Sequence, residues 1–151
     1  MHKVRIPPPV QGLFWGLVMW GVAHVLPQFS HGFTGQRPIG FILIGIGLTF
    51  DFVSIAAFIR AKTTPNPVHI ERASKLVTGG LYRISRNPMY LGLALILSGV
   101  AILLGNPINL IALALFIWGM NILQIRPEEA LLSEKFGPQY YSYSQRVRRW
   151  I

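Results

Sequence analysis

The sequence predicts an all-α membrane protein with four transmembrane helices, a tight hairpin of the third and fourth helices, and a cytoplasmic amphipathic helical tail. Composition is the first reason: 52% of the 151 residues are hydrophobic and only 13% are charged, whereas soluble domains carry about a quarter charged residues. The mean hydropathy is positive, at +0.45. Four apolar stretches and a one-sided distribution of basic residues are the other two reasons.

The apolar stretches are Val10 to Leu26, Ile39 to Ile59, Met89 to Gly105 and Pro107 to Gln124. Each has about 17–21 residues, the length that crosses a hydrocarbon core of about 30 Å as a helix. Buried helices of a soluble protein are also apolar, but four of them in so short a chain leave too little polar sequence to cover a soluble core. The turn around Asn106 makes the last two stretches a hairpin.

The basic residues set the expected orientation. Of the 14 lysines and arginines, two precede the first stretch, six lie between the second and third, and five follow the fourth, while Arg37 alone lies on the other side. Cytoplasmic loops carry such an excess. We therefore expect a multi-pass protein of a bacterial inner membrane, with both termini, the loop 60–88 and the tail 125–151 in the cytoplasm. The net charge of +9 then faces anionic lipids rather than nucleic acid.

Several classes of site are excluded or disfavoured. The chain has no cysteine, which removes disulfides, thiolate metal ligands and cysteine nucleophiles. The histidines and acids show no metal-ligand spacing. Lys3 and Arg5 resemble the start of a signal peptide, but no small-x-small cleavage site follows, so we expect the first stretch to be a span. Asp51 inside the second stretch indicates a functional site, a protonated acid or a structural pairing with a neighbouring helix, and all three readings stay open.

The third stretch begins with a helix-start signal. Asn87 suits an N-cap position and Pro88 the first helical position, and a well-capped helix accounts for both. The free N–H groups of a helix start also favour an anionic ligand, and Arg83 and Arg86 flank this one.

The tail predicts two short segments. Pro127 can begin a helix with Glu128 and Glu129 in its first turn, where acids complement the helix dipole or anchor a ligand. Gly137 can end this helix. The remaining residues interleave tyrosines and Trp150 with arginines, a composition typical of a membrane interface.

These motifs carry a family resemblance. The run Arg86-Asn87-Pro88-Met89-Tyr90-Leu91-Gly92 opens a span, and Glu128-Glu129 is followed by Leu132, Phe136-Gly137, Tyr140, Tyr143 and Arg146-Val147. Together they resemble the isoprenylcysteine carboxyl methyltransferase family, and phospholipid N-methyltransferases are similar in this region. The segments 63–67 and 76–83 also resemble bacterial members. The resemblance covers residues 60–151, whereas the first two spans contribute topology alone.

The resemblance implies an integral membrane enzyme that binds S-adenosylmethionine at the cytoplasmic side and takes a lipophilic or lipid acceptor from the bilayer. It assigns the cofactor pocket to Arg86, Asn87, Tyr90, Glu128 and Glu129, with Tyr82 and Arg83 in its wall. It places Arg146 against the acceptor, where a guanidinium can hold a carboxylate through two hydrogen bonds. Asn87 departs from the family's commoner histidine, and Arg148 stands where a proline commonly follows.

The motif set contains no obvious catalytic base. This favours a carboxylate, a thiolate or another ionised acceptor over an amine, although a lipid head group stays open. The competing reading is a non-catalytic membrane scaffold that keeps the family architecture. A transporter is disfavoured because the four spans offer few polar residues for a path. Neither the acceptor nor the oligomeric state follows from the sequence.

Overall fold

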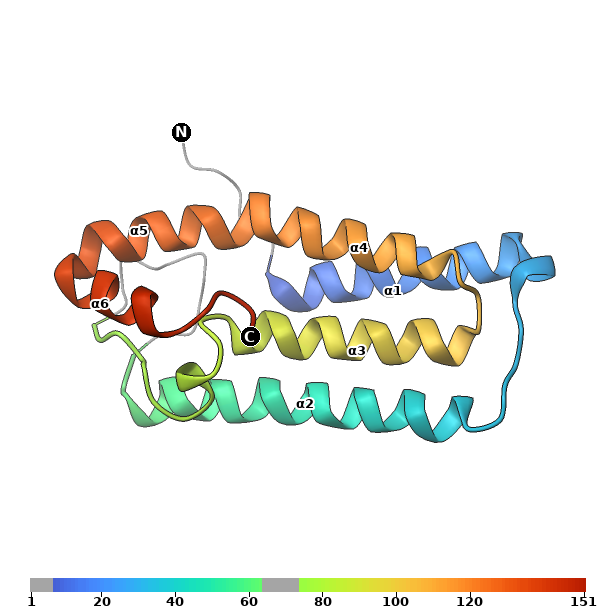
Figure 1. The fold of residues 1–151 in the computed structure, drawn as a ribbon, viewed down its shortest axis with the longest axis horizontal. Coiled ribbons are helices and arrows are strands. Elements are labelled where there is room, and N and C mark those ends of the chain that lie inside the picture. Colours follow the sequence, from blue (N-terminus) through green and yellow to red (C-terminus); the bar gives the residue numbers. More distant parts are fainter. Residues whose placement is uncertain (1–6, 64–73) are drawn as a thin grey trace.

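The computed structural model describes residues 7–63 and 74–151, and every regular element among them is helical. The helices are α1 (Pro8–Val25), α2 (Gln36–Arg60), α3 (Pro88–Leu104), α4 (Asn109–Gly119), α5 (Arg126–Phe136) and α6 (Pro138–Arg146), with 3-10 turns at Pro27–Phe29 and Gly80–Arg83 and a π-helix at Met120–Ile125. Helices α1 to α4 lie side by side along the long axis, and α5 extends beyond them (Figure 1). The all-α prediction is confirmed.

The helix bounds follow the apolar stretches closely in the first three cases. The fourth differs, because α4, the π-helix and α5 form one continuous helix, Asn109–Phe136, of 28 residues. No loop precedes Pro127. A proline ring clashes with the carbonyl four residues before it, and here the helix widens, so that the Arg126 N–H bonds to Asn121 O, five residues back. Glu128 and Glu129 do lie in the first turn of α5, and Gly137 ends it with φ 48°.

Helices α2 and α3 are in backbone contact through glycines spaced two turns apart. A Cβ atom on Gly47 would lie 2.5 Å from the Gly92 carbonyl oxygen, and one on Gly99 would lie 2.6 Å from the Gly40 carbonyl oxygen. Small residues that let helix backbones meet are typical of helix pairs in membranes. This contact fixes α3, and with it the segment that precedes α3.

The rest of the core lies where α1 crosses α3 and α4. Met19, Leu97 and Phe116 are buried there, and Trp15 meets the Phe116 ring edge to face at 6.5 Å. The end of the bundle away from α5 is closed by Asn106, whose amide donates to Leu26 O at 2.9 Å, and by the His31 N–H, which donates to Gly105 O at 2.9 Å.

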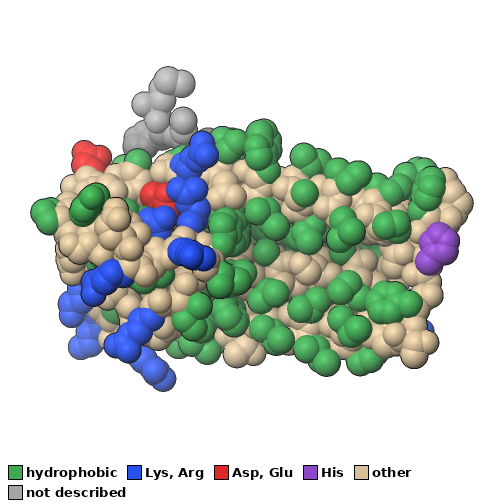
Figure 2. Space-filling model, in the orientation of Figure 1, with side chains coloured by type: hydrophobic (Ala, Val, Ile, Leu, Met, Phe, Trp, Pro, Cys, Tyr) green, Lys and Arg blue, Asp and Glu red, His purple; other side chains and the backbone are tan. Residues whose placement is uncertain are grey.

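The outer surface of the helices is apolar. Figure 2 shows hydrophobic side chains along the length of the bundle and Lys and Arg gathered at the end that holds α5 and α6. By length and composition, two helices among the described residues can cross a membrane, Gln36–Arg60 and Asn109–Phe136, and α3 is a shorter apolar helix. The apolar windows of these two are only 11% and 28% buried, which is the reverse of a core helix in a soluble protein.

Replacing Gly47 by alanine should destabilise the fold, because the new methyl group meets the α3 backbone. Overpacking of this kind costs about 1–3 kcal/mol. Gly45→Ala, two residues away where a Cβ meets nothing within 4 Å, is the matched control and gains about 1 kcal/mol of helix propensity. Thermal unfolding in detergent micelles measures both. Equal midpoints for the two variants would contradict the close α2–α3 contact.

Candidate active site

Two consecutive carboxylates of α5 serve different partners. Neighbouring residues of a helix point in directions about 100° apart, so Glu128 is directed into the bundle, whereas Glu129 is directed at the segments that precede α3 and follow α6. Both side chains leave the helix just after the π-helical stretch, at the polar end of the apolar bundle.

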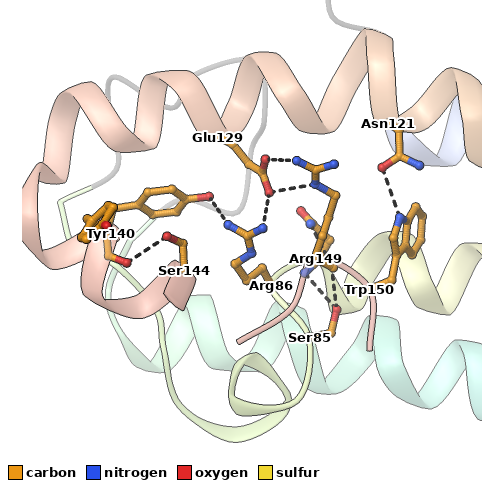
Figure 3. Close-up of polar contacts among 10 residues, drawn as sticks. Ser85, Arg86, Asn121, Glu129, Tyr140, Ser144, Arg149 and Trp150 are labelled. Atoms are coloured by element: carbon orange, nitrogen blue, oxygen red, sulfur yellow. Dashed lines mark hydrogen bonds and ion pairs between the residues drawn. The ribbon is translucent and has the colours of Figure 1, made fainter. Parts of the chain in front are cut away.

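Glu129 holds two guanidinium groups (Figure 3). Its Oε1 lies 3.0 Å from Nη2 of Arg86 and accepts from Nε of Arg149 at 3.1 Å, while its Oε2 accepts from Nη2 of Arg149 at 2.6 Å. Nη1 of Arg86 donates to the Tyr140 hydroxyl at 3.4 Å. The hydrogen bonds to Glu129 raise the pKa of Arg149, so this guanidinium stays charged. Glu129, Arg86 and Arg149 form the Glu129 cluster, in which one carboxylate contacts two guanidinium groups.

The segment before α3 is held in place by the backbone that follows α6. The Arg86 N–H donates to Arg148 O at 2.9 Å, and the Arg149 carbonyl accepts from the Asn87 amide at 3.0 Å and from the Ser85 hydroxyl at 3.3 Å. Asn87 occupies the N-cap position, but its side chain makes no cap bond. The expected side-chain cap is therefore wrong, because the amide is used to join two distant segments.

Glu128 lies in a buried polar pair with α3. Its Oε1 accepts from the Tyr90 hydroxyl at 2.6 Å and from the Gln124 amide at 2.8 Å. Gln124 belongs to the π-helix, and such widened turns are frequent at functional sites. Widening changes the direction of the side chains that follow it, which brings Glu128 opposite the first turn of α3.

Tyr82 is buried and packs edge to face on Phe58 of α2, with 5.4 Å between ring centroids. Its carbonyl oxygen accepts from the Tyr143 hydroxyl at 2.7 Å. Burial raises the pKa of both phenols, and for Tyr82 the neighbouring Tyr143 adds to the effect. Both side chains therefore stay neutral and serve as walls and hydrogen-bond donors.

Six of the eight residues expected in the site gather at this end of the bundle: Tyr82, Arg86, Asn87, Tyr90, Glu128 and Glu129. The other two, Arg83 and Arg146, are exposed, and Nε of Arg146 donates to Ser142 O of its own helix at 3.2 Å. The structure does not bring Arg146 to the Glu129 cluster, and its acceptor role stays a prediction. Residues 64–73 of the expected loop lie outside the described residues.

Sequence reasoning missed Ser85, Gln124 and Arg149. Arg149 carried a signal, because it is one of three arginines in the last six residues, but composition alone assigned that segment to the membrane interface. Asp51, left open by the sequence, faces Gly92 across the α2–α3 contact, and its buried Oδ1 has no hydrogen bond within the described residues.

Comparison with known proteins identifies the family. The phospholipid methyltransferase family model matches residues 36–139, which covers α2 to α5 and includes Arg86 and Glu129. The chain therefore belongs to the phospholipid methyltransferase family.

The chain is also similar to individual proteins named as isoprenylcysteine O-methyltransferases. The chain is 36% identical over 108 residues to protein-S-isoprenylcysteine O-methyltransferase B of Arabidopsis thaliana, covering 72% of this chain and 55% of that protein. It is 31% identical over 109 residues to a probable protein-S-isoprenylcysteine O-methyltransferase of Oryza sativa subsp. indica, covering 72% of this chain and 57% of that protein. The chain thus spans little more than half the length of these relatives. No solved structure matches.

Removing the Tyr90 hydroxyl tests the buried pair. Tyr90→Phe leaves Glu128 without one donor, and an unsatisfied buried acceptor costs about 1–3 kcal/mol. We expect a lower midpoint of thermal unfolding in detergent. Tyr141→Phe, at an exposed position, is the control and should unfold at the wild-type temperature. A Tyr90→Phe protein as stable as the control would rule out a stabilising pair.

Proposed function

We propose that the protein is an S-adenosylmethionine-dependent membrane methyltransferase that modifies a lipophilic acceptor, with residues 1–151 as a single domain. One observation carries the proposal: Arg86 and Glu129, from motifs far apart in the sequence, meet at 3.0 Å at the polar end of an apolar helix bundle. Family membership supplies the reaction class.

The proposed topology has four spans, α1 to α4. Helices α1 and α3 have 18 and 17 residues, close to the minimum for crossing. Exposed apolar side chains on α1, α2 and α4 and the basic residues at the α5–α6 end support this reading (Figure 2). The basic end would face the cytoplasm of a bacterium, as the positive-inside rule requires.

The donor set fits the proposed cofactor. S-Adenosylmethionine carries a carboxylate, an ammonium group and an adenine ring. The cluster has an excess of one positive charge, and the buried Nε of Arg86 has no hydrogen-bond partner among the residues that the structure describes, which suits the carboxylate. Glu128 suits the ammonium group, and Tyr82 and Tyr90 offer walls for the ring. The Asn87 amide donates to the carbonyl oxygen of Arg149, so Asn87 lies next to the Glu129 cluster.

The chain's own contribution would be placement. When bound, S-adenosylmethionine would supply a methyl group on a positively charged sulfur, and that sulfur would keep the electron pair of the C–S bond as the methyl carbon bonds to an acceptor oxygen or nitrogen. Holding two reactants in line can supply about 7–11 kcal/mol of the barrier reduction. Two parts of the chain are suited to holding the reactants in line, because hydrogen bonds fix each of them. They are the segment 85–87 and the first turn of α5.

The structure favours a carboxylate acceptor over an amine. An amine must lose a proton before it attacks, but Glu129 is bound by two arginines and Glu128 accepts from Tyr90 and Gln124. Neither is a ready base. The relatives are named for methylation of isoprenylcysteine, an acid with an apolar tail. A non-catalytic scaffold is the competing function.

Cofactor binding tests the proposal. Calorimetry of the purified protein in detergent should show saturable binding of S-adenosylmethionine. Glu129→Gln should weaken it about tenfold or more, because Glu129 holds Arg86, the proposed partner of the cofactor's carboxylate, through a charged contact of about 1.5–3 kcal/mol. Glu134→Gln, an exposed carboxylate of the same helix, should bind like wild type. If the folded wild-type protein does not bind the cofactor, the methyltransferase proposal is wrong and the non-catalytic scaffold becomes the better account.

The class of acceptor can be determined with methyl-labelled cofactor and a total bacterial lipid extract. We expect the label in an organic-soluble product that mild base releases as methanol, as a methyl ester requires. A base-stable labelled product would indicate an amine acceptor instead, and label recovered only in water-soluble material would contradict a lipophilic acceptor.

A further inference from the structure

The guanidinium of Arg149 has one open edge. An arginine can bind two carboxylates in bidentate fashion, because its five N–H groups lie along more than one edge of a plane. Glu129 uses the edge formed by Nε and Nη2. Nη1 makes no hydrogen bond within the described part of the chain, and the Arg149 side chain is 33% exposed, compared with 15% for Arg86. Of the two arginines, Arg149 is thus the accessible one.

This open edge is held in a fixed position. The Arg149 carbonyl accepts two hydrogen bonds from Ser85 and Asn87, and the preceding carbonyl accepts from the Arg86 N–H. On the other side, the Trp150 indole donates to the Asn121 Oδ1 atom at 3.2 Å. The side chain's own ion pair with Glu129 fixes its remaining torsions, so little conformational entropy is lost when a ligand binds.

The open edge also lies where polar and apolar parts of the molecule meet. Figure 3 shows the free side of the guanidinium turned away from Glu129, toward Asn121 and Trp150. The Trp150 ring packs against the apolar core of the bundle. Arg146 offers no such position, because it is exposed and bound to its own helix.

We propose that Arg149 is the acceptor-binding residue, which receives the carboxylate of a lipophilic acid on its Nη1–Nη2 edge. The inference rests on the proposed function and names the residue that selects its substrate. Each carboxylate oxygen would accept one hydrogen bond from this edge, and a second lone pair on one of them would stay available to attack the methyl carbon. The apolar tail would leave along Trp150 toward the helix bundle. Arg149 lies beyond the residues matched by the family model, which end at position 139.

Binding of an acid and its neutral analogue tests this assignment without turnover. The protein in detergent, saturated with S-adenosylhomocysteine, is titrated with N-acetyl-S-farnesylcysteine and with the corresponding carboxamide. Wild type should bind the acid at least tenfold more tightly than the amide. Arg149→Gln should abolish that preference, and Arg149→Lys should retain part of it, since an ammonium group keeps the charge but not the two parallel hydrogen bonds.

Two controls separate recognition from folding and from general charge. Arg148→Gln removes the same charge from an exposed neighbouring side chain and should keep the full preference. Cofactor affinity and thermal midpoint are measured for every variant, so a loss of fold is recognised, and Arg149→Lys then reports on the side chain in a folded protein.

The outcomes are distinct. Equal binding of acid and amide by wild type, or an unchanged preference in folded Arg149→Gln, would overturn the assignment while leaving cofactor binding intact. Loss of the preference in Arg146→Gln instead would transfer the role to that residue and likewise overturn it. Failure of the proposed function itself would appear separately, as wild-type protein that does not bind S-adenosylmethionine.

Discussion

Glu129 places one carboxylate between two guanidinium groups, and the polar end of the molecule is organised around it. The three residues come from the first turn of α5, from the segment before α3 and from the segment after α6. Because the groups are only partly exposed, removing one partner would leave charge without compensation in a poorly solvated place, which is far more costly than losing a surface ion pair.

The helices determine where that carboxylate can be. Backbone contact between α2 and α3 sets the height of Arg86 relative to the bundle, and the π-helix sets the direction in which α5 leaves α4. Arg86 and Glu129 then meet at 3.0 Å, where the segment before α3 lies against the first turn of α5. The bundle has an apolar surface and a basic end, and the cluster lies at that basic end.

Much of this could be predicted from residues alone, and the reasons for the remainder are physical. Hydrophobic length predicted the helices, and the family resemblance of two motifs predicted that Arg86, Tyr90, Glu128 and Glu129 lie together, because each of these signals is local. The role of Arg149 depends on a chain reversal after Gly137 that no local pattern specifies. Asn87 was predicted as a side-chain N-cap because residue preferences at helix starts take no account of an acceptor far away in the sequence, here the Arg149 carbonyl. Pro127 suggested a new helix start, whereas widening of the preceding turn allowed one continuous helix.

The central claim is that Arg86 and Glu129 act as one unit joining the two motifs. A double-mutant cycle tests it directly: Arg86→Gln, Glu129→Gln and the double variant are compared in cofactor affinity and in thermal midpoint, with wild type as the fourth corner. The account predicts strong coupling, so that the second substitution adds little once the first is made. Effects that simply add, in a protein that remains folded, would contradict it.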